Sequence, residues 1–173
     1  NLRPILQSNL NCSFQSRDRH RFGPLGHFLR GQFDQEHLRI GFPRDQLGEF
    51  YIHDLRATGV EFTTPPADFG VPTARSMVLV TPDGHRTMNT FLGAAQHLPA
   101  SALDEAQIRD AAILYLEGYL WDPETPRYAM IRAIEVARSA GRKVAFTLSD
   151  TFCIDRHRDG FNALVDGGRI DIL

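Results

Sequence analysis

The sequence predicts a mixed α/β fold with a parallel sheet, and three observations support this prediction. Two short apolar runs, Ala111–Leu116 and Lys143–Leu148, are typical of strands buried on both faces of a parallel sheet. The segment between them has apolar residues at helical spacing, so the three pieces form a βαβ unit with a right-handed crossover. Residues 73–92 alternate polar and apolar side chains around a turn, as a β-hairpin does. Because ligands bind beyond the carboxyl ends of strands in such sheets, we expect a binding site at Glu117–Trp121 and Ser149–Phe152.

Composition restricts the class of protein. The 173 residues are 42% hydrophobic and 23% charged, which is ordinary for one globular domain with its own core. A net charge of −2 gives no electrostatic reason to expect a nucleic-acid or membrane partner, and no apolar run is long enough to cross a bilayer. The start lacks the apolar segment of a signal peptide, and Cys12 and Cys153 are too few for a disulfide framework. We therefore expect a cytoplasmic protein.

Residues 1–43 differ from the rest of the chain. They show no sustained period of two or 3.6, and residues 1–40 hold six arginines against three acidic residues. Three interpretations stay open: an irregular arm, an arm that binds nucleic acid, and a segment translated from another reading frame. The predicted organisation is an irregular leader at 1–43 and an ordered domain at 44–173.

The ordered part is expected to begin with a helix and a loop. A helix is predicted at Gln46–Thr58 because its apolar residues share one face, namely Leu47, Phe50, Tyr51 and Leu55. Gly59 is expected to end this helix. Thr63–Pro72 contains three prolines and a glycine, which predicts a loop.

The hairpin is expected to consist of two strands, Thr73–Thr81 and Arg86–Leu92, joined by a Pro-Asp-Gly turn at Pro82–His85. Its polar residues are interleaved with apolar ones, so one face is not core. Two interpretations of that face stay open: an ordinary solvated surface, or a surface that covers a ligand.

The remaining elements flank the βαβ unit. Ser101 is expected to cap a helix at Ala102–Asp110, and Asp122 is a candidate cap for the helix that ends at Gly141. The last two expected elements are a helix and the beginning of a strand, Asp155–Asp166 and Ile170–Leu173.

The ends of the two central strands carry the candidate polar and aromatic residues. Glu117 and Asp150 have two interpretations: they bind substrate hydroxyls or order water near a metal ion, or they cap the helices that follow. Tyr119, Trp121 and Phe152 either stack on a planar ligand or pack within the helix layer. The polar run 155–159 is expected to be a solvated helix start. The sequence has no Walker-type phosphate loop, G-x-G-x-x-G or H-E-x-x-H motif, and its histidines do not fall at metal-ligand spacing.

Six short stretches are informative by their order and spacing: Asp45–Phe50, Leu55–Val60, Pro72–Arg75, Pro82–Thr90, Gly93–Ala95 and Tyr115–Tyr119. With these stretches, the chain from about Asp45 to Leu173 resembles the ribokinase-like (PfkB) family of carbohydrate and nucleoside kinases, and within it the adenosine-kinase-like branch. The resemblance covers about three quarters of the chain.

This resemblance implies a fold and a set of substrate-binding residues. The fold is a ribokinase-like three-layer α/β/α sandwich with a small β lid, of which the hairpin 73–92 is a part. The resemblance places five hairpin residues on or near the face that closes over the substrate: Thr73, Arg75, Met88, Thr90 and Leu92. Leu120 and Phe152 match positions that pack against the nucleoside base in adenosine kinases. Tyr119 and Asp150 are added as their neighbours on geometric grounds, and no catalytic residue or metal ligand is assigned.

The resemblance also implies an activity. The family transfers the γ-phosphoryl group of ATP, with Mg²⁺, to a primary hydroxyl of a sugar or nucleoside, and positioning and exclusion of water carry most of that catalysis. Its Gly-Gly motif with a downstream Asn is expected before Asp45, and its Gly-x-Gly-Asp and Asn-x-x-Glu motifs after Leu173, but the sequence contains none of them. We therefore expect a fold that is incomplete at both ends, in a kinase fragment that is inactive alone.

Two alternatives stay open. In the first, the chain is a non-catalytic module that binds a nucleoside or sugar or forms a homodimer through the lid. In the second, it is a small α/β protein of unrelated function that shares only the fold.

Overall fold

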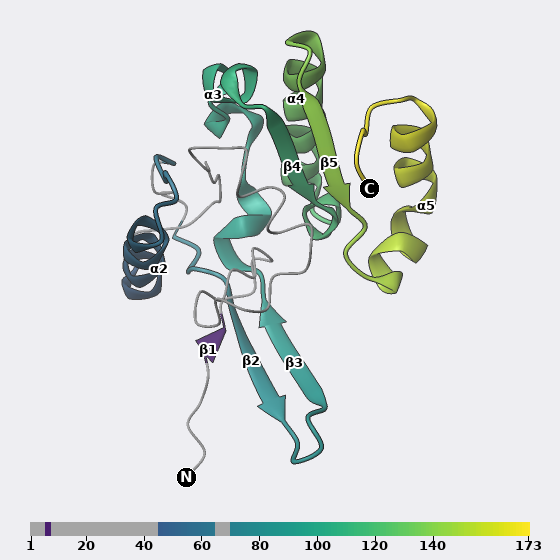
Figure 1. Cartoon of the computed structure of the whole chain (residues 1–173). Coiled ribbons are helices and arrows are strands. Elements are labelled where there is room, and N and C mark those ends of the chain that lie inside the picture. The colour runs from purple at the N-terminus through teal and green to yellow at the C-terminus, as the bar shows by residue number, and fades with distance from the viewer. Residues whose placement is uncertain (1–5, 8–44, 65–69) are drawn as a thin grey trace. The chain divides into compact units, whose positions relative to one another are not determined.

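The computed structural model describes residues 6–7, 45–64 and 70–173 of the chain (Figure 1). The chain divides into two compact units, Asn1–Ala95 and Gln96–Leu173. The first is built on an antiparallel sheet and the second on a parallel pair of strands with helices. The predicted α/β class is confirmed. Apart from Leu6–Gln7, the predicted leader 1–43 lies outside the described residues, so its irregular character stays a prediction.

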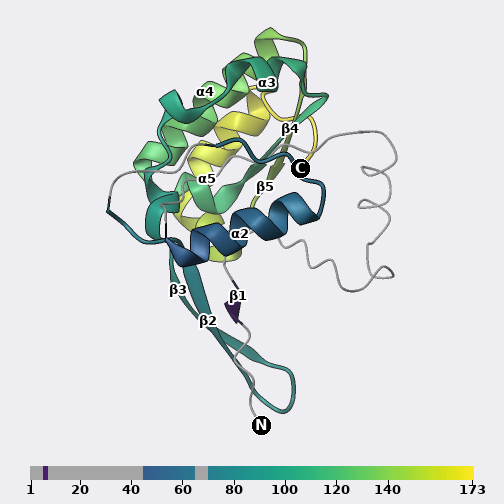
Figure 2. The ribbon, with the colours of Figure 1, turned by 90° about the vertical axis from the view of Figure 1, so that its left-hand side faces the viewer.

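The first unit contains α2 (Gln46–Ala57), and its amino end is fixed by Asp45. The Asp45 carboxylate accepts a hydrogen bond from the Gly48 N–H at 2.8 Å, which satisfies one of the free donors at the helix start. The predicted apolar face is divided between two environments. Tyr51 and Leu55 pack, with Ile52, against buried Phe62, whereas Leu47 and Phe50 stay exposed. Figure 2 shows α2 along its length.

The hairpin of the first unit follows the prediction closely. β2 (Arg75–Val80) pairs in an antiparallel manner with β3 (Arg86–Phe91), and β1 (Leu6–Gln7) pairs with the other edge of β2. The Thr81 N–H donates to the His85 carbonyl at 3.0 Å, and Gly84 adopts a φ of +85°. The turn needs glycine there because residues with a side chain rarely adopt that conformation.

The second unit contains the predicted βαβ core. β4 (Ile113–Glu117) and β5 (Lys143–Thr147) pair in parallel, with Ile113 opposite Lys143 and Glu117 opposite Thr147. α4 (Glu124–Ser139) connects them through η3 (Gly118–Trp121), so the predicted strand–helix–strand order is confirmed. Because the last residues of the two strands, Glu117 and Thr147, lie opposite each other, the carboxyl ends of β4 and β5 lie side by side.

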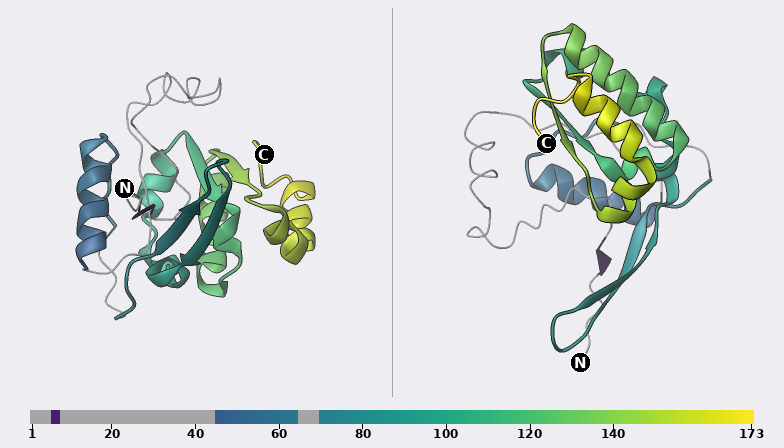
Figure 3. Two further views of the ribbon diagram at one scale, coloured as in Figure 1. Left: turned by 90° about the horizontal axis from the view of Figure 1, so that it is seen from below. Right: turned by 90° about the vertical axis from the view of Figure 1, so that its right-hand side faces the viewer.

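Both long helices of the second unit pack on one face of this pair of strands (Figure 3). Leu116, Val144 and Phe146 from the strands share one core with residues of α4 and α5 (Thr151–Asp166), among them Met130, Ile134, Ala137, Phe161 and Leu164. The prediction that the first strand is buried on both faces is wrong for β4, because Tyr115 on the opposite face is 55% exposed.

Three helix starts differ from the predictions. Asp104, not Ser101, caps α3 (Glu105–Asp110), and its carboxylate accepts from the Ala106 and Gln107 N–H groups at 3.1 and 3.2 Å. Ser101 lies instead in the short 3₁₀ helix η2 (Ala100–Ala102). Asp104 directly precedes the first helical residue, the position from which a side chain reaches these donors.

The starts of α4 and α5 also differ. Pro123 occupies the cap position of α4 without a side-chain hydrogen bond, so Asp122 does not cap this helix. α5 begins at Thr151, four residues before the predicted start, because Asp150 caps it. The polar run 155–159 therefore lies inside α5, where His157 departs from helical geometry with a φ of −124° and a ψ of 19°.

The last residues run beside β5. Ile172 forms a parallel bridge with Ala145, and the Asp171 side chain accepts a hydrogen bond from the Val144 N–H at 2.7 Å. Arg138 of α4 donates to both oxygens of the same carboxylate, at 2.8 and 2.7 Å. The predicted strand at 170–173 is thus represented by a single bridge among the described residues. None of the described helices is both long and apolar enough to span a membrane.

Candidate functional site

A connected group of polar side chains lies at the carboxyl ends of β4 and β5. We call it the strand-tip cluster and define it as Glu117, Tyr119, Ser149 and Asp150. Glu117 is the last residue of β4 and Tyr119 follows in η3, while Ser149 and Asp150 lie between β5 and α5. The cluster occupies the edge of the parallel pair at which the sequence predicts a site.

Hydrogen bonds join the members of the cluster. The Ser149 hydroxyl donates to Glu117 Oε1 and accepts from the Tyr119 N–H at 2.9 Å. The Tyr119 hydroxyl in turn donates to Asp150 Oδ2 at 3.0 Å. The structure therefore brings together two of the predicted site residues, Tyr119 and Asp150. Ser149 lies in the stretch at which the sequence predicts a site, but it is not among the residues to which a substrate-binding role is assigned.

The backbone beside the cluster is constrained at two positions, Ser149 and Gly118. Ser149 has a φ of +70°, a left-handed conformation that is costly for a residue with a side chain. A Cβ atom at Gly118 would lie 2.6 Å from the Thr147 carbonyl oxygen and 2.9 Å from Ser149 Oγ. Glycine at position 118 therefore permits the close approach of the two strand ends.

Burial changes the acid–base behaviour of the cluster. It raises the pKa of Glu117 above 4.5, and hydrogen bonds from Ser149 and Tyr115 only partly offset this effect. Burial also raises the pKa of Tyr119 to about 12, with a further contribution from its hydrogen bond to the Asp150 carboxylate. At neutral pH the Tyr119 hydroxyl is therefore protonated and can act as a donor.

The two interpretations of the strand-end acids have different outcomes. Asp150 caps a helix, because its Oδ1 atom accepts from the Cys153 N–H at 2.7 Å. Glu117 makes no side-chain cap. All four carboxylate oxygens of the pair accept hydrogen bonds from within the chain, the last from Tyr115 to Glu117 Oε2 at 3.2 Å. No group of three His, Cys, Asp or Glu residues suited to a metal ion occurs in the described ranges, and no magnesium ligand is assigned.

The aromatic candidates fall in different environments. Trp121 is only 6% exposed and makes edge-to-face contacts with Phe146 and Phe161, with ring centroids 6.4 and 5.8 Å apart, so it belongs to the core. Leu120 is half-buried and packs against the same core. Phe152, by contrast, is 72% exposed in the first turn of α5, two residues after Asp150. Its ring is free to contact a ligand.

A second polar network lies between the end of η3 and α5. The Asp122 carboxylate accepts hydrogen bonds from Arg156 and from the His157 ring, which joins η3 to the irregular turn of α5. Burial alone would raise the pKa of Asp122, but these hydrogen bonds outweigh it and hold the pKa below 3.8. The sequence predicts this polar run to be solvated. The structure shows that Arg156 and His157 bind Asp122 outside the run, and that Arg158 donates to Asp155 within it at 2.7 Å.

The hairpin candidates do not share one surface. The register pairs Arg75 with Phe91, and the Arg75 guanidinium lies 4.9 Å from that ring. Met88 and Thr90 pair with Val78 and Ser76, which point to the other face of the ribbon. Arg75 therefore lies on one face of the ribbon, and Met88 and Thr90 lie on the other.

The other two hairpin candidates flank the strands. Thr73 precedes β2 and is buried, and its N–H and hydroxyl donate to the Asp45 carboxylate at 2.7 and 2.5 Å. These two hydrogen bonds tie the base of the hairpin to the start of α2. Leu92 follows β3 and is half-buried.

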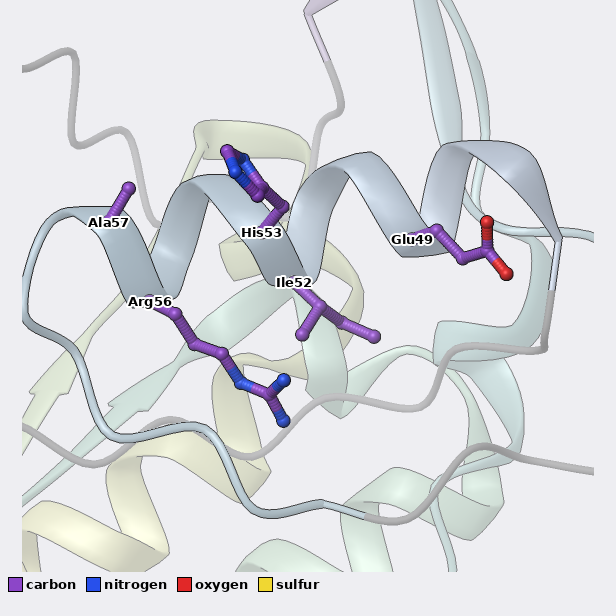
Figure 4. Close-up of a pocket in the computed structure, with 5 residues that line it drawn as sticks. All are labelled: Glu49, Ile52, His53, Arg56 and Ala57. Atoms are coloured by element: carbon purple, nitrogen blue, oxygen red, sulfur yellow. The ribbon is translucent and has the colours of Figure 1, made fainter.

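A surface pocket of about 440 Å³ lies on α2 (Figure 4). Its lining comes from one helix and consists of Glu49, Ile52, His53, Arg56 and Ala57. Arg56 is engaged through a hydrogen bond to the Phe62 carbonyl at 3.4 Å. The pocket contains none of the predicted site residues, and we assign no ligand to it.

Comparison with known proteins identifies the family. The model of the pfkB family carbohydrate kinases matches residues 40–169. An adenosine kinase structure from Sinorhizobium meliloti is 43% identical, with a TM-score of 0.75, over 79% of this chain and 42% of its own. A probable sugar kinase from Rhizobium etli CFN 42 is 41% identical with the same TM-score and the same coverage.

A curated relative is more distant. The 5-dehydro-2-deoxygluconokinase of Shouchella clausii (strain KSM-K16) is 25% identical over 131 residues, which cover 64% of this chain and 36% of the relative. The chain therefore spans less than half the length of the proteins that it matches. The ribokinase-like fold expected from the sequence is confirmed by these structures. The chain belongs to the pfkB family of carbohydrate kinases.

Proposed function

We propose that this chain is the acceptor-binding part of a nucleoside or sugar kinase, and that its acceptor is adenosine or a closely similar nucleoside. The observation that supports the acceptor is the 43% identity with the adenosine kinase of Sinorhizobium meliloti over 79% of the chain. The reaction is transfer of the ATP γ-phosphoryl group to a primary hydroxyl, and it takes place in the cytoplasm. A ribokinase II structure from E. coli with ATP and Mg²⁺, 19% identical, shares the fold.

In this proposal, bound ATP with Mg²⁺ supplies the phosphoryl group and neutralises its charge. The residues of this chain bind and orient the acceptor. Phe152 offers an exposed ring to the planar base, and half-buried Leu120 supplies an apolar contact. Neither ATP nor Mg²⁺ is assigned to any described residue.

We also propose that the chain alone does not transfer phosphate. It spans 42% of the related kinase chains, and the catalytic base that the family resemblance implies has no counterpart in its sequence. Binding and turnover should therefore separate in this protein.

The experiment is a paired measurement on the purified chain. Calorimetry with adenosine, D-ribose and D-fructose measures binding, and ADP release with Mg²⁺ and ATP measures turnover. We expect adenosine to bind more tightly than the sugars, without ADP release above the background. Turnover at a rate typical of enzymes, about 1–100 s⁻¹ for kinases, would contradict the proposal of inactivity. Absence of binding by all three compounds would remove the proposed acceptor site.

The exposed hairpin supports a second candidate function, self-association. Met77, Leu79 and Phe91 lie on one face of β2 and β3 and are all exposed. Two such faces could cover each other in a homodimer. Sedimentation measurements over a range of protein concentrations test this: Leu79→Lys should lower the dimer fraction. A monomer at all concentrations would exclude it.

A further inference from the structure

We propose that Glu117 is a positioning residue, which acts through Ser149 to hold Tyr119, Asp150 and Phe152 in the arrangement that meets the acceptor. This inference rests on the proposed function, because it concerns the same site. Glu117 itself is not the contact to the acceptor in this proposal. Its role is to fix the loop between β5 and α5.

The first argument is the direction of the Glu117 hydrogen bonds. Oε1 accepts from the Ser149 hydroxyl and Oε2 accepts from the Tyr115 hydroxyl at 3.2 Å. Both oxygens are thus engaged within the chain, and the side chain is largely shielded from solvent. A carboxylate with this geometry organises its neighbours rather than offering a free oxygen to a ligand.

The second argument is the conformation that Glu117 supports. Ser149 has a φ of +70°, a left-handed conformation that is unfavourable for a residue with a side chain. Such a conformation persists only when the surrounding bonds determine it. The Ser149 hydroxyl makes two of those bonds, one to Glu117 and one from the Tyr119 N–H at 2.9 Å.

The third argument is the path from Ser149 to the exposed part of the site. Ser149 is directly followed by Asp150, which accepts from the Tyr119 hydroxyl at 3.0 Å and caps α5 through the Cys153 N–H at 2.7 Å. Phe152 lies in that first helical turn. A change in the Ser149 conformation would therefore move the Tyr119–Asp150 pair and the Phe152 ring together.

The test compares four variants of the whole chain. Glu117→Ala removes the acceptor for Ser149, whereas Glu117→Gln keeps an acceptor oxygen without the charge. Ser149→Gly removes the hydroxymethyl group and its hydrogen bonds without adding backbone strain, because glycine adopts a φ of +70° readily. Glu135→Ala is the matched control, since Glu135 is an exposed glutamate of α4 whose ion pair with Arg132 lies at 3.6 Å.

Two readouts distinguish the positioning role from the proposed function. Adenosine affinity is measured by calorimetry, and amide hydrogen exchange is measured at Tyr119 and Cys153. The Cys153 amide contacts neither Glu117 nor Ser149, so faster exchange there reports a displaced Asp150. This second readout needs no ligand. If the unmodified chain binds no adenosine, the proposed function fails, and amide exchange still decides the positioning role.

We expect Glu117→Ala to weaken adenosine binding about 10-fold and to accelerate both amides by a similar factor, the effect of one buried hydrogen bond. Glu117→Gln and Glu135→Ala should stay within about 3-fold of the unmodified chain in both readouts. Unchanged exchange in Glu117→Ala would overturn the proposal. Equal loss in Glu117→Gln would also overturn it, because the charge itself would then be required. If Glu117→Ala does not fold, Ser149→Gly takes its place, and unchanged exchange at Cys153 overturns the proposal.

Discussion

Glu117 shows how a single side chain can be costly for the fold and useful for the site. Burial disfavours its charged form and raises its pKa, while two hydroxyl donors stabilise the same charge. An uncharged isostere would keep the oxygen that accepts from Ser149. The carboxylate is therefore expected to lower stability at neutral pH.

Glu117→Gln should raise the free energy of unfolding at pH 7 by no more than about 1 kcal/mol. The folded-state pKa lies above 4.5, so the unmodified protein loses stability as the pH rises through the interval between the unfolded and folded values. The glutamine variant lacks this loss. Urea unfolding at pH 4 and pH 7 should show a difference between the two proteins that grows with pH, and a constant difference would contradict the assignment.

Phe152 represents the opposite case, an apolar side chain that contributes little to the core. Phe152→Ala should change the free energy of unfolding by less than about 0.5 kcal/mol, because the ring is 72% exposed. It should weaken adenosine binding about 10-fold if the ring stacks on the base. Phe50→Ala, at an exposed phenylalanine of α2, is the matched control and should leave binding unchanged. Equal affinity of both variants would remove Phe152 from the site.

At the scale of the elements, the start of α5 is the point where fold and site meet. Asp150 caps the helix, and Asp122 binds Arg156 and His157 one turn further on. The helix departs from regular geometry at His157, which itself binds Asp122 and precedes the buried Phe161 by four residues. The first turn, which carries Phe152, is thus held by the Asp150 cap together with buried Cys153, and the later turns by the apolar packing of Phe161 and Leu164.

Asp150→Ala should destabilise the protein by about 1 kcal/mol, the usual effect of removing a side-chain cap. It should also accelerate hydrogen exchange in the first turn of α5 more than in α4. Asp159→Ala offers a control on the same helix, because this aspartate is exposed and caps nothing. Uniform changes along α5 in both variants would argue against a local role of the cap.

At the scale of the whole molecule, several lowered pKa values share one consequence. In Asp45 and Asp122, hydrogen bonds outweigh the opposing effect of burial, and in Asp171 the Val144 N–H and Arg138 lower the pKa directly. Each lies below 3.8 in the folded state. Their stabilising contribution is complete above that value and disappears as the pH falls through the folded pKa values.

We therefore expect the urea midpoint to fall steeply below about pH 4. Asp171→Asn should reduce this steepness, because it removes one of the titrating groups together with its pairing to Arg138. Unfolding curves at pH 7, 4 and 3 provide the measurement. If the urea midpoint of the variant fell with decreasing pH as steeply as that of the unmodified protein, Asp171 would not be among the groups that cause the acid destabilisation.

The architecture was largely accessible from the sequence because periodicity and turn chemistry are local properties. The hairpin around Gly84 and the βαβ unit between Ile113 and Thr147 follow their residue patterns closely. Helix starts were less accessible because more than one residue able to cap lies near the start of a helix, as Ser101 and Asp104 do near α3. Asp104 and Asp150 cap their helices, whereas Asp122 is engaged by two residues more than 30 positions away.

The site was accessible only in part, for a similar reason. Strand ends could be predicted to meet, and they bring Tyr119 and Asp150 together. The left-handed Ser149, however, depends on contacts between the ends of two strands, which no local pattern encodes. The division of Arg75 from Met88 and Thr90 follows from strand register, and the family resemblance alone did not show it.

The buried Cys153 thiol makes the strand ends observable by simple chemistry. Its S–H donates to the Gly118 carbonyl at 3.3 Å, and burial raises its pKa to about 11, so the thiol in the closed structure is neither accessible nor ionised. A disulfide reagent can react only after the turn that carries Cys153 has separated from η3. In a Cys12→Ser background, the rate at which Cys153 is modified therefore measures the rate of this local opening. A bound phosphoryl acceptor that holds the strand ends together would lower that rate.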